Sequence, residues 1–130
     1  MPLDQHQEKT YPHDPSSVYQ AALLAVQKLE GRIVSADADN LRVEAKFPKV
    51  ILGKTLGERT QLSFQIKAQD QGSVVVIDAY PLDALERKLL FGARKGVTLT
   101  VVTWFIAHLE HNLAMAQPEM PQPETGERNS

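Results

Sequence analysis

The sequence contains no cysteine. This absence excludes disulfide bonds, thiol nucleophiles and thiolate metal ligands. The formal net charge at pH 7 is only -2, so the balance of charge gives no argument for nucleic-acid binding. The N-terminus MPLDQHQEKTYPHDP lacks the basic and apolar regions of a secretory signal. The longest apolar stretch, residues 97–109, is shorter than the roughly 20 apolar residues of a membrane span. We therefore expect a cytoplasmic protein.

The composition is sufficient for a single domain. A chain of 130 residues with 42% hydrophobic residues can bury a core without metals or disulfides. Residues 1–11 are polar, and we expect them to form a flexible N-terminal arm. Residues 115–130 are rich in proline and have little to bury, which is typical of a disordered tail. The folded domain is therefore expected over residues 12–114.

The pattern of apolar residues predicts a helix near the N-terminus. Asp14 followed by Pro15 is a strong helix start, because the aspartate caps the backbone and proline suits the first helical position. Gly31 is a natural residue to end the helix. Apolar side chains recur at helical spacing between these signals, at Val18, Ala22, Ala25, Val26 and Leu29.

Four segments of alternating apolar and polar residues follow this helix. They are RIVSA (32–36), LRVEAKF (41–47), TQLSFQIKA (60–68) and SVVVIDAY (73–80). Such alternation predicts strands with one buried face, and the polar residues 37–40 predict a hairpin turn. A buried sheet face needs a cover, which the N-terminal and C-terminal helices can supply. We predict an α+β fold, with a four-stranded antiparallel meander sheet and both helices on one face.

The first half of this pattern resembles a known module. The helix after Asp14, the segment GRIV (31–34), Asp37 and the segment LRVEA (41–45) are similar in order to the small α+β module of BamC and related bacterial lipoprotein domains. The resemblance implies a helix-grip-like arrangement and a tendency toward non-enzymatic binding. The chain lacks the lipobox cysteine of those lipoproteins, so the resemblance does not imply an outer-membrane location.

The C-terminal segment GVTLTVVTWFIAHLEHNL has two apolar sides if it is helical. One side, which includes Phe105 and Leu109, should cover the sheet. The other is a candidate interface formed by Val97, Val101, Trp104, His108 and His111. Either residues 82–96 or a second protein chain could cover it, and a homodimer would use the same stripe twice. Residues 97–103 are rich in β-branched side chains, so a fifth strand is an alternative there.

Two loops mix apolar side chains with lysine and arginine. These candidate partner or membrane-surface loops contain Lys49, Val50, Ile51, Leu52 and Lys54, and Arg87, Lys88, Phe91, Arg94 and Lys95. This mixture suits an acidic protein groove, a lipid or an anionic membrane surface. The alternative is that the apolar residues fold back onto the core while the charges stay in water.

No catalytic, cofactor or metal site is predicted. His108 and His111 lie three residues apart and could share one face of a helix, but no third ligand is assigned to them. Asp37 and Asp39 belong to the predicted turn, where aspartate is common for its backbone hydrogen bonds.

The sequence therefore predicts a non-catalytic binding or assembly module that uses its C-terminal helix to bind itself or another protein. The alternative is a carrier of a small apolar ligand or lipid. Such a carrier would use a cavity between sheet and helices, lined by Phe64, Ile66, Ile77, Val102 and Phe105.

Overall fold

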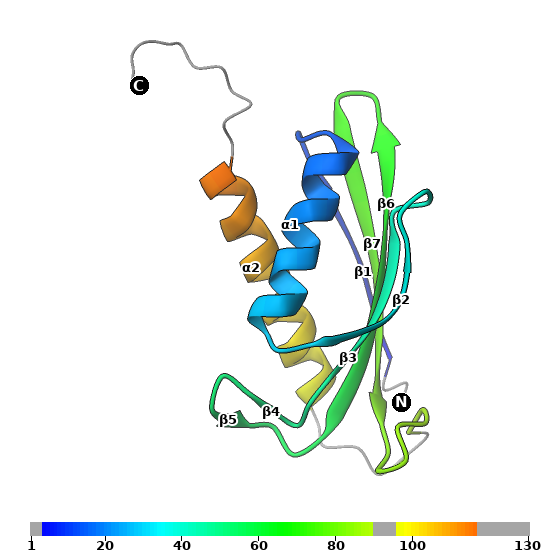
Figure 1. Cartoon of the computed structure of the whole chain (residues 1–130), viewed down its shortest axis with the longest axis vertical. Coiled ribbons are helices and arrows are strands. Elements are labelled where there is room, and N and C mark those ends of the chain that lie inside the picture. Colours follow the sequence, from blue (N-terminus) through cyan, green and yellow to red (C-terminus); the bar gives the residue numbers. More distant parts are fainter. Residues whose placement is uncertain (1–3, 90–95, 117–130) are drawn as a thin grey trace.

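The computed structural model describes residues 4–89 and 96–116 (Figure 1). Two helices lie side by side across one face of an antiparallel sheet, and a small hairpin extends beyond the end of the first helix. In chain order the elements are β1 (Gln5–Tyr11), α1 (Pro15–Lys28), β2 (Arg32–Asp37), β3 (Arg42–Phe47), β4 (Val50–Ile51), β5 (Lys54–Thr55), β6 (Arg59–Gln69), β7 (Gly72–Leu82) and α2 (Val97–Ala116).

The main sheet has five strands in the order β1-β7-β6-β3-β2. The four predicted strands form the expected meander, which confirms the α+β fold class. The fifth strand is β1, which pairs with β7 from Gln5 opposite Ala79 to Tyr11 opposite Ser73. The prediction of a flexible arm is therefore wrong over Gln5–Tyr11. The segment carries almost no apolar side chains, so backbone pairing with β7 rather than hydrophobic burial holds most of it in place.

Helix α1 begins where the capping signal places it. The Asp14 carboxylate accepts hydrogen bonds from the Ser17 amide at 3.1 Å and from the Ser17 hydroxyl at 2.7 Å. At the other end, Glu30 adopts the left-handed conformation, with φ of 65°. Gly31 is required for a different reason, because a Cβ atom there would lie 2.5 Å from the Phe47 ring. The chain thus turns from α1 into β2 in close contact with β3.

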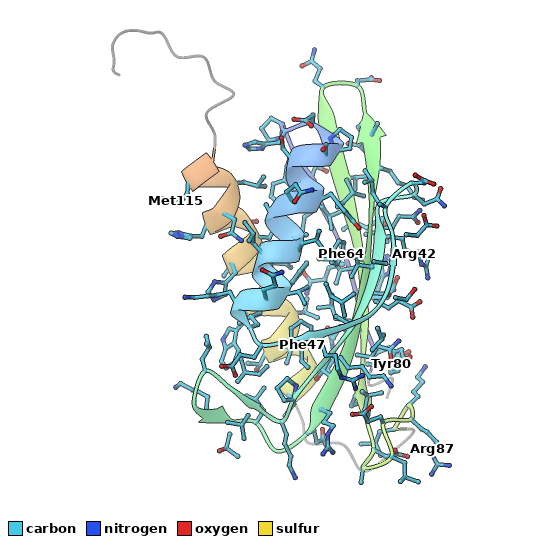
Figure 2. The ribbon with its side chains drawn as sticks, in the orientation of Figure 1. Arg42, Phe47, Phe64, Tyr80, Arg87 and Met115 are labelled. Carbon is cyan, nitrogen blue, oxygen red and sulfur yellow. The ribbon has the colours of Figure 1, made fainter. Side chains whose placement is uncertain are left out.

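Helix α2 is helical from Val97 onward, so the alternative of a strand at residues 97–103 is wrong. Its Phe105 ring stacks on Phe64 of β6 with the ring centroids 5.4 Å apart. Figure 2 shows Phe64 on the helix side of the sheet and Arg42 on the other side. Within the described residues, neither helix is long and apolar enough to cross a membrane.

Polar contacts fix α2 against its neighbours. The Tyr11 hydroxyl donates a hydrogen bond to the Glu110 carboxylate at 2.9 Å, which joins β1 to α2. Burial, together with this carboxylate, raises the pKa of Tyr11. The Asn112 amide donates to the Ala21 carbonyl at 3.0 Å, which joins α2 to α1. The first contact holds α2 against β1, and the second holds it against α1.

Candidate functional site

The second apolar stripe of α2 is largely covered by the chain itself. Val97 is 8% exposed and Val101 is fully buried, while Trp104 and His108 are half-buried and His111 is exposed. Helix α1 packs along α2 (Figure 1), while residues 90–95 of the predicted cover lie outside the described residues. The assignment of Val97 and Val101 to an interface is therefore wrong. Helical spacing defines the sides of a helix but does not reveal which neighbour covers each side.

An apolar hollow lies where the cover by α1 ends. Its volume is about 310 Å³, and we call it the Trp104 groove. It is lined by Leu29, Ile51, Leu52, Lys54, Trp104 and His108. Leu29 and Ile51 are fully buried and form its floor, whereas Leu52 is 49% exposed and lies at its rim. Lys54 and His108 supply the ionisable groups. The groove therefore offers an apolar floor and wall with two nitrogen-bearing side chains.

The hairpin formed by β4 and β5 builds one wall of this groove. Its two turn residues, Leu52 and Gly53, both have positive φ, at 51° and 81°. This turn conformation matches the twist of paired strands. It directs Ile51 into the core while Leu52 stays partly exposed. The Leu52 amide also donates a hydrogen bond to the Glu30 carboxylate at 3.2 Å, which ties the hairpin to the end of α1.

The first basic loop is thus divided between core and surface. Lys49, Val50, Leu52 and Lys54 are exposed as expected for a partner surface, but Ile51 is fully buried, so its assignment to that surface is wrong. The physical reason is the hairpin, which gives neighbouring residues opposite environments.

In the second basic loop, both cationic residues that the structure describes, Arg87 and Lys88, form ion pairs. Arg87 pairs with Asp83 at 3.5 Å, and Lys88 pairs with Asp4 at 2.8 Å while lying 5.1 Å from the centre of the Tyr80 ring. Phe91, Arg94 and Lys95 lie outside the described residues.

A second hollow adjoins the Trp104 groove and shares His108 with it. Its volume is about 500 Å³, and it is lined by Leu24, Gln27, Lys28, His108, His111 and Asn112. The predicted pair of histidines therefore lies on the surface between the two helices. In residues 4–89 and 96–116, no three histidine or carboxylate side chains gather as a metal ion would require.

Among the described residues, buried side chains pack together between the sheet and the helices. Phe64 stacks on Phe105, and Tyr19 meets Phe64 edge-on with the ring centroids 6.4 Å apart. Ile66, Ile77 and Val102 are buried beside these rings. The five residues predicted to line a ligand cavity thus form packed core. The apolar hollow lies at the surface beside Trp104 instead.

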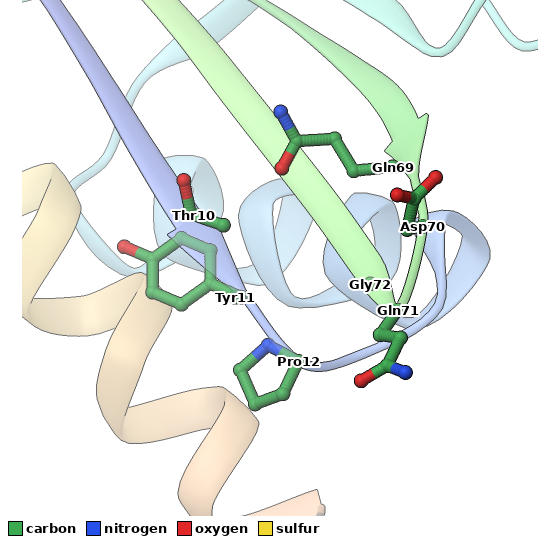
Figure 3. Close-up of a pocket in the computed structure, with 7 residues that line it drawn as sticks. All are labelled: Thr10, Tyr11, Pro12, Gln69, Asp70, Gln71 and Gly72. Atoms are coloured by element: carbon green, nitrogen blue, oxygen red, sulfur yellow. The ribbon is translucent and has the colours of Figure 1, made fainter.

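Another hollow lies at the opposite end of the molecule, between the end of β1 and the turn from β6 to β7 (Figure 3). Its volume is about 640 Å³, and its lining includes Gln69, Asp70 and Gln71. A Cβ atom at Gly72 would lie only 2.1 Å from the Tyr11 carbonyl oxygen, so backbone segments form much of this surface. The hollow has no buried aliphatic floor, and the Trp104 groove is the better candidate for a binding site.

Solved structures of other proteins share this fold. No protein-family profile and no curated protein sequence matches the chain. Several solved structures do match along most of their length. Protein CV1439 from Chromobacterium violaceum has a TM-score of 0.57 at 12% identity, with 91% of this chain and 99% of that chain covered. The chain has a helix-grip fold.

Two further structures agree. Ara h 8.0201 has a TM-score of 0.56 at 12% identity, with 85% of this chain and 97% of that chain covered. Protein MLL2253 from Mesorhizobium loti has a TM-score of 0.55 at 12% identity, with 87% and 98% covered. These are Bet v1/START-like structures. They support the helix-grip arrangement that the resemblance to BamC implied, whereas the relation to BamC itself is not confirmed.

Proposed function

We propose that this protein is a non-catalytic binding module that holds a small amphipathic molecule in the Trp104 groove. The observation that carries the proposal is the half-open apolar hollow beside Trp104, with Leu29 and Ile51 as its buried floor. Its volume of about 310 Å³ is near the lower end of the range for small-molecule sites, roughly 300–1,000 Å³. A ligand of modest size therefore fits better than a large lipid.

The polar groups of the groove favour a ligand with one anionic end. Lys54 carries a positive charge at neutral pH, and His108 can donate a hydrogen bond from its ring. Lys28 lies in the adjoining hollow and adds a second positive charge nearby. The preferred ligand class is therefore an apolar carboxylate, with its chain against Trp104 and its carboxylate toward Lys54.

The fold supports a binding role. Bet v1-like proteins are often ligand-binding carriers. Assembly through α2 is the rival, and it depends on part of the same surface, since Trp104 and Leu52 would be its exposed apolar contacts. The burial of Val97 and Val101 leaves a dimer less apolar area than the full stripe would provide.

Titration with decanoate, a medium-chain fatty acid, tests the proposal. Trp104 is the only tryptophan of the chain, so its emission reports on the groove directly. We expect a saturable change in emission, which Leu52→Glu abolishes because a carboxylate at the rim repels the ligand. Leu85→Glu is the matched control, because Leu85 is 70% exposed and does not line the groove.

Light scattering on the same samples separates the two roles. Binding by a monomer supports the ligand proposal. A dimer that ignores decanoate and dissociates in Leu52→Glu would replace the ligand with a second copy of the chain. An unchanged emission in a monomer would overturn the proposal.

A further inference from the structure

A charged pocket lies at one end of strands β2, β3 and β6, separate from the Trp104 groove. Its volume is about 250 Å³, and we call it the Glu86 pocket. Three cationic side chains line it, each from a different strand: Arg32 from β2, Lys46 from β3 and Arg59 from β6. Its other lining residues are Glu30, Phe47, Pro48 and Glu86. Side chains distant in the sequence therefore bring positive charge to one place.

A carboxylate of the chain occupies part of this charge cluster. The Glu86 carboxylate accepts a hydrogen bond from the Arg32 guanidinium at 2.9 Å, and the Lys46 ammonium lies 3.5 Å from the same oxygen. Lys46 also donates to the Glu86 carbonyl at 3.4 Å. The hydrogen bond from Arg32 is the main reason that the pKa of Glu86 is lowered. Glu86 thus sits where an anion would bind.

The turn that carries Glu86 is shaped to present it. Glu86 has φ of 63°, a conformation that is uncommon for residues other than glycine, asparagine and aspartate. The Asp83 carboxylate accepts hydrogen bonds from the amides of Leu85 at 2.8 Å and Arg87 at 3.0 Å. These contacts stabilise the turn from outside the pocket. Displacing only the Glu86 side chain would therefore leave the turn intact.

The pocket holds more positive charge than Glu86 balances. In the part of the chain that the structure describes, Arg59 takes part in no ion pair, although it lines the pocket. The second carboxylate, Glu30, accepts its hydrogen bond from the Leu52 amide. Three cations therefore share the pocket with two carboxylates, of which only Glu86 is paired with cations, namely Arg32 and Lys46. A group with more oxygens and more negative charge than a carboxylate matches this arrangement better.

We propose that the Glu86 pocket binds a phosphate group, which displaces the Glu86 carboxylate from Arg32 and Lys46 and also engages Arg59. A phosphate monoester carries a charge of about −1.5 to −2 at neutral pH and offers three oxygens. Glu86 then acts as an internal competitor that occupies the site when no phosphate is present. The apparent affinity for phosphate is then the intrinsic affinity multiplied by the fraction of molecules in which Glu86 has left the site.

Calorimetric titration of the full chain with inorganic phosphate, at constant ionic strength, tests this site. Glu86→Gln removes the competing charge, and we expect phosphate to bind about tenfold more tightly. Arg59→Gln is expected to weaken binding about tenfold, because it removes a charged donor. Arg87→Gln is the matched control, since Arg87 lies in the same turn but does not line the pocket. The affinity of the Arg87→Gln variant for phosphate should stay within about twofold of that of the wild type.

Three results would overturn the proposal. They are the absence of phosphate binding in both the wild type and Glu86→Gln, equal or weaker binding in Glu86→Gln, and equal losses in Arg59→Gln and Arg87→Gln. The last result would show attraction by surface charge alone. Circular dichroism of each variant establishes that the fold is kept. None of these variants alters a residue of the Trp104 groove, so this test is independent of the proposed function.

Two sources of the phosphate group can be separated with the same variants. Glycerol phosphate represents a free phosphate ester, and phosphatidylcholine vesicles containing phosphatidic acid represent a lipid headgroup. Binding of glycerol phosphate in the predicted order of variants supports a free ligand. Much tighter binding to the vesicles than to pure phosphatidylcholine, in the same order, supports a headgroup.

Discussion

Two neighbouring aromatic residues of α2 have opposite surroundings. Phe105 is fully buried, and its ring stacks on Phe64 in the interior. Trp104 is only half-buried, packs against the edge of the core, and borders a hollow of about 310 Å³. The two residues are adjacent in sequence and similar in hydrophobic character. Their difference comes from what lies opposite each of them.

The contrast comes from how completely each side of α2 is covered. The sheet side of α2 meets strands along its length, so rings from both layers fill the space. Among the described residues, the side of Trp104 meets Leu29 at the end of α1 and then the short β4–β5 hairpin. Packing is therefore complete at Phe105 and incomplete at Trp104. Substitution of Phe105 should therefore lower the free energy of unfolding more than substitution of Trp104.

The largest loss of stability is expected from Phe105→Ala. Removal of a buried ring leaves a cavity between α2 and β6, and such changes commonly cost about 3–5 kcal/mol. Urea unfolding followed by circular dichroism measures the change. A loss below about 1 kcal/mol would mean that the interior is loosely packed, and the contrast with Trp104 would no longer hold.

A smaller loss is expected from Gly31→Ala, at the end of α1. The added Cβ atom would lie 2.5 Å from the Phe47 ring and 2.9 Å from Val26. Overpacking of this kind costs about 1–3 kcal/mol. Because Phe47 is the main obstacle, Phe47→Leu should reduce the cost when the two changes are combined. A double-mutant cycle with no coupling would show that the clash is not the cause.

Trp104→Ala should affect ligand binding more than stability. Trp104 is half-buried, so we expect a loss of only about 1–2 kcal/mol in the free energy of unfolding. Decanoate binding, measured by calorimetry because the fluorophore is gone, should weaken at least about tenfold. A stability loss equal to that of Phe105→Ala would assign Trp104 to the core.

The smallest effect is expected at His6, on the outer face of the sheet and away from both aromatic residues. The hydrogen bond to Asp78, at 2.6 Å, is the largest cause of a raised pKa at His6, and the hydrogen bond to Glu8 adds to it. A raised pKa means that the folded state holds the proton more tightly than the unfolded state. The stabilisation is therefore full below the ordinary value of 6.5 and is lost as the pH rises through the raised value.

His6→Ala should remove this pH dependence. Urea midpoints of the wild type and the variant, compared at about pH 6 and about pH 8.5, should differ more at the lower pH. His111→Ala is the control, because His111 makes no ion pair in residues 4–89 and 96–116. A difference that grows with pH would contradict the role given to Asp78.

Local patterns were sufficient to predict much of the fold. Asp14 marks the start of α1, and the four alternating segments become the meander. The backbone amide of Asn40 donates a hydrogen bond to the Asp37 carboxylate at 3.2 Å, as expected for the turn between β2 and β3. Strand β1 was not predictable in this way. Its segment QHQEKTY has no apolar face, and its partner β7 lies more than sixty residues away in the sequence.

The candidate site was predicted only in pieces. Trp104 and His108 were assigned to one surface, and Leu52 and Lys54 to another, whereas the structure joins them in one groove. Leu29 looked like an ordinary residue of the apolar face of α1, and no sequence signal connected it to the hairpin. The opposite environments of Ile51 and Leu52 follow from the positive φ at Leu52, which apolar patterning does not reveal.

The proposed function requires that the ligand binds beside Trp104 and not in the interior. The most direct measurement is an NMR titration with decanoate that follows the Trp104 indole N–H and the methyl groups of Ile51, Ile77 and Val102. We predict saturable shifts of the indole and Ile51 signals, with the signals of Ile77 and Val102 nearly unchanged. Large shifts of Ile77 and Val102 without a change at Trp104 would place the ligand between the sheet and the helices and contradict this account.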